Sequence, residues 1–368
     1  MPTFDIAMPL ALLFVVTATL LLHKHTEKKL KAPVEEKEFQ KKDILLFAAV
    51  ISIVISTIAL TSFINPGNTF ENVLMAIFLG SYTMLLFTLT HLFSDIKKRK
   101  AQLFSIGFGI ISMIMGIVSL LEPLQDSVTI FRVSAFFGLS IVCFVVAAYE
   151  QKKNGDAKTK WYLAVQPPAL FLLLFIFFNI LHFENTLNIW FPYLLDVFGF
   201  TFAILIVLYI SPLFSWKSVG IFAILLTLLD IILVFSGPMV VAAETLTGLG
   251  LPVVIYLPNI PLHLSTVGDI AFRGLGLGDF FFAGILAIQT FNKFGKKYAY
   301  AVVASIVLSF GLWEIFLMDL LAFFNLGGFP ATVFIITGWI PVAIIGTLMH
   351  KKQKEIVPPQ TDLSGGTL

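Results

Sequence analysis

The sequence predicts an all-α polytopic membrane protein with about eleven transmembrane helices. Of its 368 residues, 58% are hydrophobic and 12% are charged, against about 25% charged in ordinary soluble domains. Its 39 Phe and near-continuous apolar runs could not all be buried in one soluble core. These observations exclude a soluble enzyme, a nucleic-acid-binding protein and a disordered scaffold, and they make the lipid bilayer a partner. The single cysteine, Cys143, excludes an intrachain disulfide framework.

Eleven stretches are long and apolar enough to cross a hydrocarbon core, which takes roughly 20 helical residues. They are 4–22, 44–64, 72–93, 102–121, 128–149, 161–181, 190–210, 217–237, 275–292, 298–324 and 330–349. No basic residue precedes the first stretch, and several lysines follow it, which favours a retained anchor over a cleaved signal peptide.

Lys and Arg mark alternate connections between these stretches. The basic connections are 23–43, 94–101, 150–160, the start of the stretch at Lys217, 293–297 and 351–354. Because basic loops stay in the cytoplasm, we predict the N-terminus outside and the C-terminus in the cytoplasm. The longest connection, 238–274, holds the β-branched run Val253–Tyr256, which indicates an extended segment. The polar tail 350–368 is expected to be disordered.

Two intramembrane acids are the candidate catalytic residues, because a charge in hydrocarbon is costly and is a functional candidate by default. Asp230 lies about 10 Å from the outer end of its span and Asp279 roughly 6–10 Å from the outer end of the next. Carboxylates that meet at this depth would share one proton. One could then activate water and the other protonate a carbonyl, as in aspartic proteases. This chemistry needs no metal and no cofactor.

Two irregular segments are candidate substrate-binding elements. Gly274, Gly276 and Gly278 alternate with leucines, and this period of two indicates a strand. An open strand edge beside a catalytic acid could pair with an unwound substrate. Pro330, before Ala331 and Thr332, disrupts helical pairing and could leave carbonyls free for such a ligand.

Structural interpretations stay open for each of these features. A lone intramembrane Asp can pair with a polar neighbour, alternating glycines can serve close helix packing, and proline commonly starts a helix. For Asp196, Glu314 and Asp319, which lie nearer span ends or have polar company, we expect structural roles.

The order of these motifs resembles the intramembrane aspartyl proteases of the presenilin and signal peptide peptidase family. The run Gly276–Asp279 matches the family's Gly-x-Gly-Asp motif, and Asp230 lies on the preceding span, as the family's first aspartate does. The segments 230–243 and 251–258 are similar to those of signal peptide peptidases, and Pro330–Thr332 stands where the family has Pro-Ala-Leu. The likeness is good over 217–349 and looser over the rest of the last nine spans.

The resemblance implies a peptidase that cuts transmembrane helices or leftover signal peptides with Asp230 and Asp279. It implies substrate contacts at a set of seven residues: Gly274, Gly276, Leu277, Gly278, Pro330, Ala331 and Thr332. The predicted orientation resembles signal peptide peptidase, so substrates would have cytoplasmic N-termini. The absence of glycosylation sites, of a retention signal and of a long acidic loop favours a homologue in the plasma membrane of an archaeon or bacterium.

The departures from the family pattern are specific. Leu229 replaces the usual Tyr and Thr332 the usual Leu; we expect neither to touch the aspartate pair, although both could alter rate or substrate choice. Because the family core has nine spans, residues 1–65 are expected to be an added N-terminal pair. Residues 72–216 would then supply the first core helices, 217–349 the catalytic helices and 350–368 the tail.

Two other functions remain as alternatives. A prepilin-type peptidase also uses Gly-x-Gly-Asp but places its acids at the cytoplasmic face, against the charge pattern here. A proton- or cation-coupled transporter would use Asp230 and Asp279 together with Glu314 and Asp319. Zinc and serine intramembrane peptidases are disfavoured, because the sequence holds no His-Glu-x-x-His and no mid-membrane Ser with a His at matching depth.

Overall fold

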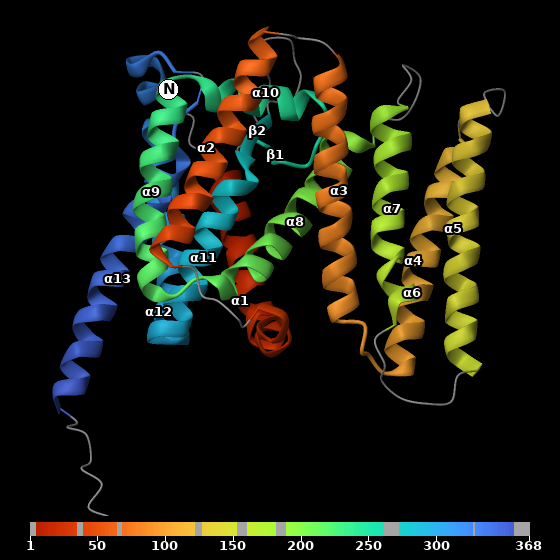
Figure 1. Cartoon of the computed structure of the whole chain (residues 1–368), viewed down its shortest axis with the longest axis horizontal. Helices are drawn as coiled ribbons and strands as arrows, with labels where there is room; N and C mark the ends of the chain where they lie inside the picture. Colours follow the sequence, from red (N-terminus) through yellow and green to blue (C-terminus); the bar gives the residue numbers. More distant parts are fainter. Residues whose placement is uncertain are drawn as a thin grey trace, which may run out of the picture.

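A computed structural model describes residues 5–34, 40–64, 68–121, 127–152, 160–181, 189–260, 272–326 and 328–356 (Figure 1). The α-helices are α1 (Ala7–Val34), α2 (Lys41–Ile64), α3 (Asn68–Leu92), α4 (Lys98–Ser119), α5 (Ser127–Lys152), α6 (Trp161–Ala164), α7 (Gln166–Phe175), α8 (Leu195–Ile210), α9 (Trp216–Phe235), α10 (Pro238–Gly248), α11 (Leu277–Phe294), α12 (Lys296–Phe324) and α13 (Ala331–Ile356). Short π-helical turns at Ile176–Ile180 and Trp190–Leu194 adjoin α7 and α8, and a 3₁₀ turn at Ser211–Leu213 follows α8. Strands β1 (Val254–Pro258) and β2 (Phe272–Gly276) form one small antiparallel sheet.

The chain is a multi-pass integral membrane protein. Within the described residues, 10 helices are long and apolar enough to cross a bilayer, and they coincide with ten of the eleven predicted spans. The eleventh prediction, 275–292, corresponds to α11, which is 18 residues long but is not among those ten. Asp279, Gln289, Asn292 and Lys293 lower its hydropathy.

Helix α11 lies at the centre of the helix bundle. Twelve of its residues are buried, and it packs against α1, α8, α9, α12 and α13. A Cβ on Gly284 would lie 2.7 Å from Val207 of α8, so glycine is what lets these two helices approach so closely. A helix enclosed in this way does not need an apolar surface facing lipid, which explains why it can carry polar side chains.

The first two helices belong to this bundle and do not lie outside it. Helix α1 packs against α8, α11, α12 and both strands, whereas α2 packs against α9 and α10. The α4–α5 hairpin is the peripheral pair, since its main neighbours outside itself are α6 and α7 (Figure 1, right). The expectation that residues 1–65 are an addition to a nine-helix core therefore stays a prediction about ancestry, and the packing gives it no support.

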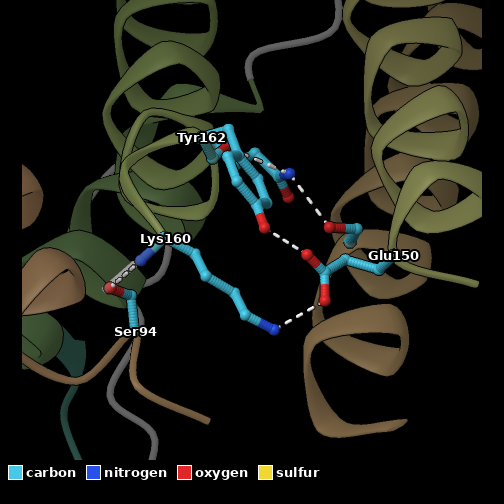
Figure 2. A network of polar contacts seen from close by, with 6 residues as sticks. Ser94, Glu150, Lys160 and Tyr162 are labelled. Carbon is cyan, nitrogen blue, oxygen red and sulfur yellow. Dashed lines mark hydrogen bonds and ion pairs between the residues drawn. The ribbon is translucent and has the colours of Figure 1, made fainter. Parts of the chain in front are cut away.

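A buried ion pair anchors the α4–α5 hairpin to the start of α6. Glu150, at the end of α5, accepts hydrogen bonds from Lys160 Nζ (2.6 Å) and from the Tyr162 hydroxyl, and its side chain is almost completely buried. The Lys160 backbone N–H donates to Ser94 Oγ (2.8 Å). Figure 2 shows that the network joins three chain segments.

Three connections differ from the sequence-based expectation. The predicted loop at 23–43 is helical up to Val34, and the connection at 238–274 contains α10. The tail expected to be disordered from 350 continues α13 as far as Ile356, because its first residues, Lys-Lys-Gln-Lys-Glu, are good helix formers. Residues 357–368 lie outside the described part of the chain.

Three of the predicted basic connections lie at one end of the bundle. In Figure 1 the α3–α4 connection, the start of α9 and the end of α13 are all at the lower end, whereas α10 and the strands are at the upper end. The segments at the lower end carry Lys97, Lys217 and Lys351. The packing thus reproduces the alternation read from the loops, and which end faces the cytoplasm stays a prediction.

Candidate functional site

Both candidate aspartates line one open cavity of about 460 Å³ at the β-sheet end of the bundle. Its walls come from α9, α10, β2, α11, α12, the start of α13 and the residues before it, with Met8 of α1 and Val254 and Tyr256 of β1. The expectation from span depth, that Asp230 and Asp279 lie at one level of the bilayer, stays a prediction. Their lateral proximity, which depth cannot give, is present in the structure, because the two carboxylates line one cavity and interact electrostatically with each other.

Asp230 is held by the first turn of α13. Helix α9 begins with a capping box between Ser215 and Ser218, and Asp230 lies one turn before its other end, 8% exposed. Its Oδ2 accepts a 2.6 Å hydrogen bond from Thr332 Oγ1, and the Thr332 backbone N–H donates to the same carboxylate. The expectation that Thr332 does not touch the pair is therefore wrong: the start of α13 points directly at Asp230.

Asp279 is held by the first turn of its own helix. Gly276, in an extended conformation, is the N-cap residue of α11, which puts Asp279 at the third helical position. The Gly276 backbone N–H donates to the Asp279 carboxylate. This is the half of a capping box in which an acidic side chain reaches back to the N-cap amide.

Two helix N-termini therefore converge on the aspartate pair. Each supplies backbone N–H groups that have no partner within their own helix, and the positive end of a helix dipole, which favour negative charge nearby. In a bilayer, where water is scarce, the cost of keeping a carboxylate ionised is reduced by such donors. The arrangement stabilises one negative charge on the pair and gives each carboxylate a fixed orientation.

The free edge of β2 runs along the same cavity. The Tyr256 backbone N–H donates to Asp196 Oδ1 of α8 (2.6 Å), so the outer edge of β1 is occupied. In an antiparallel strand the backbone N–H and C=O groups of successive residues point to opposite edges. Because those of Tyr256 point to the outer edge of β1, those of Ile255 and Leu257 point toward β2. Their register partners are Leu275 and Arg273. The polar backbone groups of Gly274 and Gly276 are thus left on the outer edge of β2, among residues that line the cavity.

The predicted strands are confirmed, and the three glycines have different surroundings. A Cβ on Gly274 would lie 2.7 Å from Val254 Cγ1, whereas one on Gly276 would lie 3.4 Å from Asp279 Oδ2. A Cβ on Gly278 would meet nothing within 4 Å. Gly274 and Gly276 line the cavity and Gly278 does not. Leu277 is buried, and its backbone N–H donates to the Val253 carbonyl (2.9 Å).

The three residues of the predicted Pro-Ala-Thr element also differ in whether they line the cavity. Ala331 lines the cavity, whereas Pro330 and Thr332 are buried behind it. The Pro330 carbonyl accepts from the Val333 N–H (3.1 Å), and the ligand-binding role expected for the carbonyls beside this proline stays a prediction. The element acts on the site through Thr332.

The other membrane acids do not form one set with the aspartate pair. Glu314 lines the cavity but is paired with Arg273 of β2. Asp196 caps the edge of β1, and Asp319 is exposed on α12 outside the cavity lining. Structural roles expected for Asp196 and Glu314 agree with these contacts. Sequence reasoning missed Arg273 as a site residue, although it lies one position before the first glycine of the repeat.

Within the described ranges, no group of three or more His, Cys, Asp or Glu side chains could hold a metal ion. Comparisons of the chain with protein families, curated proteins and solved structures found no match. The family resemblance therefore rests on the motifs themselves.

Proposed function

We propose that this protein is an intramembrane aspartyl endopeptidase that hydrolyses peptide bonds in transmembrane helices or leftover signal peptides. The observation that carries the proposal is the meeting of Asp230 and Asp279 in one cavity, beside an edge of β2 that pairs with no other strand in the described part of the chain. The family resemblance implies the same activity.

The chemistry requires one ionised and one protonated carboxylate. The ionised member removes a proton from water as the water oxygen attacks the scissile carbonyl carbon. The protonated member donates its proton to the carbonyl oxygen. Collapse of the resulting gem-diol breaks the C–N bond, and the amide nitrogen leaves as an amine after taking a proton from the pair. One water is consumed for each bond that is cut.

The strand edge supplies a way to present an unwound substrate. A helix in a bilayer satisfies its own backbone hydrogen bonds, so its peptide bonds are shielded until it unwinds. An unwound segment would regain backbone partners by pairing with the N–H and carbonyl of Gly274 and with the carbonyl of Gly276. The Gly276 N–H is already engaged by Asp279. Such pairing would bring its carbonyls next to Asp279, three residues beyond Gly276.

The test is cleavage of reporter membrane helices of both orientations by purified protein in lipid. We expect the wild type to cut, and Asp230→Ala and Asp279→Ala to lose all detectable activity while keeping a folded, monodisperse state. Asp319→Ala is the matched control, because it removes a membrane acid that does not line the cavity, and it should cut at the wild-type rate.

Two outcomes would contradict the proposal. Cleavage that persists in either Asp230→Ala or Asp279→Ala would show that the pair is not catalytic. If no reporter of either orientation is cut, but proton or cation flux is measured and is lost in the same variants, the protein is a transporter.

A further inference from the structure

The two aspartates have unequal hydrogen-bond environments. Asp230 accepts from both the hydroxyl and the backbone N–H of Thr332. For Asp279 the structure gives one backbone donor, the Gly276 N–H. The Thr332 hydroxyl is 2.6 Å from Asp230 Oδ2, a distance typical of hydrogen bonds to an ionised acceptor. Thr332 is buried at 4% exposure, so water does not compete for this bond.

We propose that Thr332 is a positioning residue that keeps Asp230 as the ionised member of the pair, and that the shared proton resides on Asp279. The inference rests on the proposed peptidase function and assigns a role to each aspartate. Donors to the charged form of a carboxylate favour that form. With one negative charge shared between the two groups, the side with more donors holds it.

This assignment fixes the direction of each proton transfer. Asp230 takes the proton from the attacking water, and Asp279 gives its proton to the scissile carbonyl oxygen. Asp279 is also the aspartate next to the free edge of β2, where an unwound substrate would place its carbonyls. The acid is thus beside the group that it must protonate.

The other charged groups around the cavity do not reverse this assignment. Arg273 of β2 is paired with Glu314 of α12, so each largely neutralises the other. Glu244 of α10 lines the cavity but is exposed at its rim, where solvent screens its charge. Asp230 is the more buried of the two aspartates, and the hydroxyl of Thr332 donates to Asp230 alone.

The experiment compares Thr332→Val, which removes the hydroxyl at equal size, with Thr332→Ser, which retains it. We expect Thr332→Val to lower kcat about 10- to 100-fold, the effect of losing a hydrogen bond to a charged group. The acidic limb of its kcat–pH profile should move to higher pH by about one unit. Thr332→Ser should restore both toward wild type. Thr227→Val is the control, because Thr227 is buried on α9 and its Oγ1 has no hydrogen-bond partner in the described chain.

Infrared titration of the carboxyl bands gives a second measurement that does not need activity. The Asp230 component is identified by its loss in Asp230→Asn, and in Thr332→Val the protonated form should persist to higher pH than in wild type. A purely structural role for Thr332 would lower the melting temperature without moving either pH dependence, and this result would overturn the proposal. Failure of the wild type to cut any reporter would refute the peptidase function alone, and the infrared titration would then decide the role of Thr332.

Discussion

Two glycines on the free edge of β2 are expected to respond differently to the same substitution. In Gly274→Ala the new methyl group would lie 2.7 Å from Val254 Cγ1 and 3.0 Å from Tyr256 Cε1. Real Cβ atoms do not approach other atoms so closely, so the sheet must shift. In Gly276→Ala the nearest atom is Asp279 Oδ2 at 3.4 Å, an ordinary contact that needs no rearrangement.

The expected magnitudes follow from these distances. Overpacking by one methyl group costs about 1–3 kcal/mol, so Gly274→Ala should lower the free energy of unfolding by that amount and the apparent melting temperature by a few degrees. Gly276→Ala should leave stability within about 0.5 kcal/mol of wild type. Its methyl group covers the Asp279 carboxylate on the side of the strand edge, and cleavage should therefore fall at least about 10-fold, the equivalent of 1.4 kcal/mol in the barrier.

The assay combines thermal unfolding in detergent with cleavage of the reporter helix. Gly278→Ala is the matched control for stability, because a Cβ there meets nothing within 4 Å. Val254→Ala in the Gly274→Ala background removes the clashing Cγ1. The double variant should regain stability relative to the sum of the two single changes, with a coupling of about 1 kcal/mol or more.

Three results would refute the reasoning. Equal stability of Gly274→Ala and Gly278→Ala would mean that β1 and β2 do not pair in this register. If the effects of Gly274→Ala and Val254→Ala on stability are additive, the two residues are not in contact. Full cleavage by Gly276→Ala would show that the edge beside Asp279 does not receive the substrate.

Two further predictions concern buried ion pairs. Arg273→Met leaves Glu314, whose side chain is 3% exposed, without its cation; breaking such a pair costs about 3–5 kcal/mol. The apparent melting temperature should fall, and Arg273→Met combined with Glu314→Met should recover most of it; a double variant as unstable as the single one would contradict this. Lys160→Met, which removes the cation beside Glu150 and leaves its hydrogen bond from Tyr162 (Figure 2), should speed hydrogen exchange at the end of α5. It should leave cleavage unchanged, because the network lies outside the cavity lining. Loss of cleavage would mean that the α4–α5 hairpin is coupled to the site.

The helices and strands could be predicted because hydropathy and residue period are local properties. Ten spans were found from apolar length alone, and the alternation of glycine and leucine indicated β2 before its partner was known. Helix α10 was missed, although Pro238 at its first position is a recognised start signal. The other prolines and glycines in the 238–274 connection favoured a loop, so this start signal was not interpreted as a helix.

Lateral contacts could not be predicted in this way. The hydrogen bond between Thr332 and Asp230 joins residues 102 positions apart, and neither hydropathy nor spacing constrains which helix starts lie side by side. For the same reason, α1 could not be placed against α11 from the sequence. Its apolar composition indicates a membrane span and gives no information about whether its neighbours are lipid or α11.

The aspartate pair and the two helix starts satisfy each other's hydrogen-bonding groups, which the bilayer would otherwise leave without partners. A helix that begins inside the membrane has backbone N–H groups without partners, and a carboxylate there has lost its water. Glycines precede α11 and Pro330 precedes α13, and both helices begin at the wall of the same cavity. The N–H groups of Gly276 and Thr332 then meet the two carboxylates. A segment that merely crossed the membrane would gain nothing from such interruptions, whereas a site that must keep a charge and admit water needs them. The interruptions are therefore best explained by the chemistry of the site and not by packing alone.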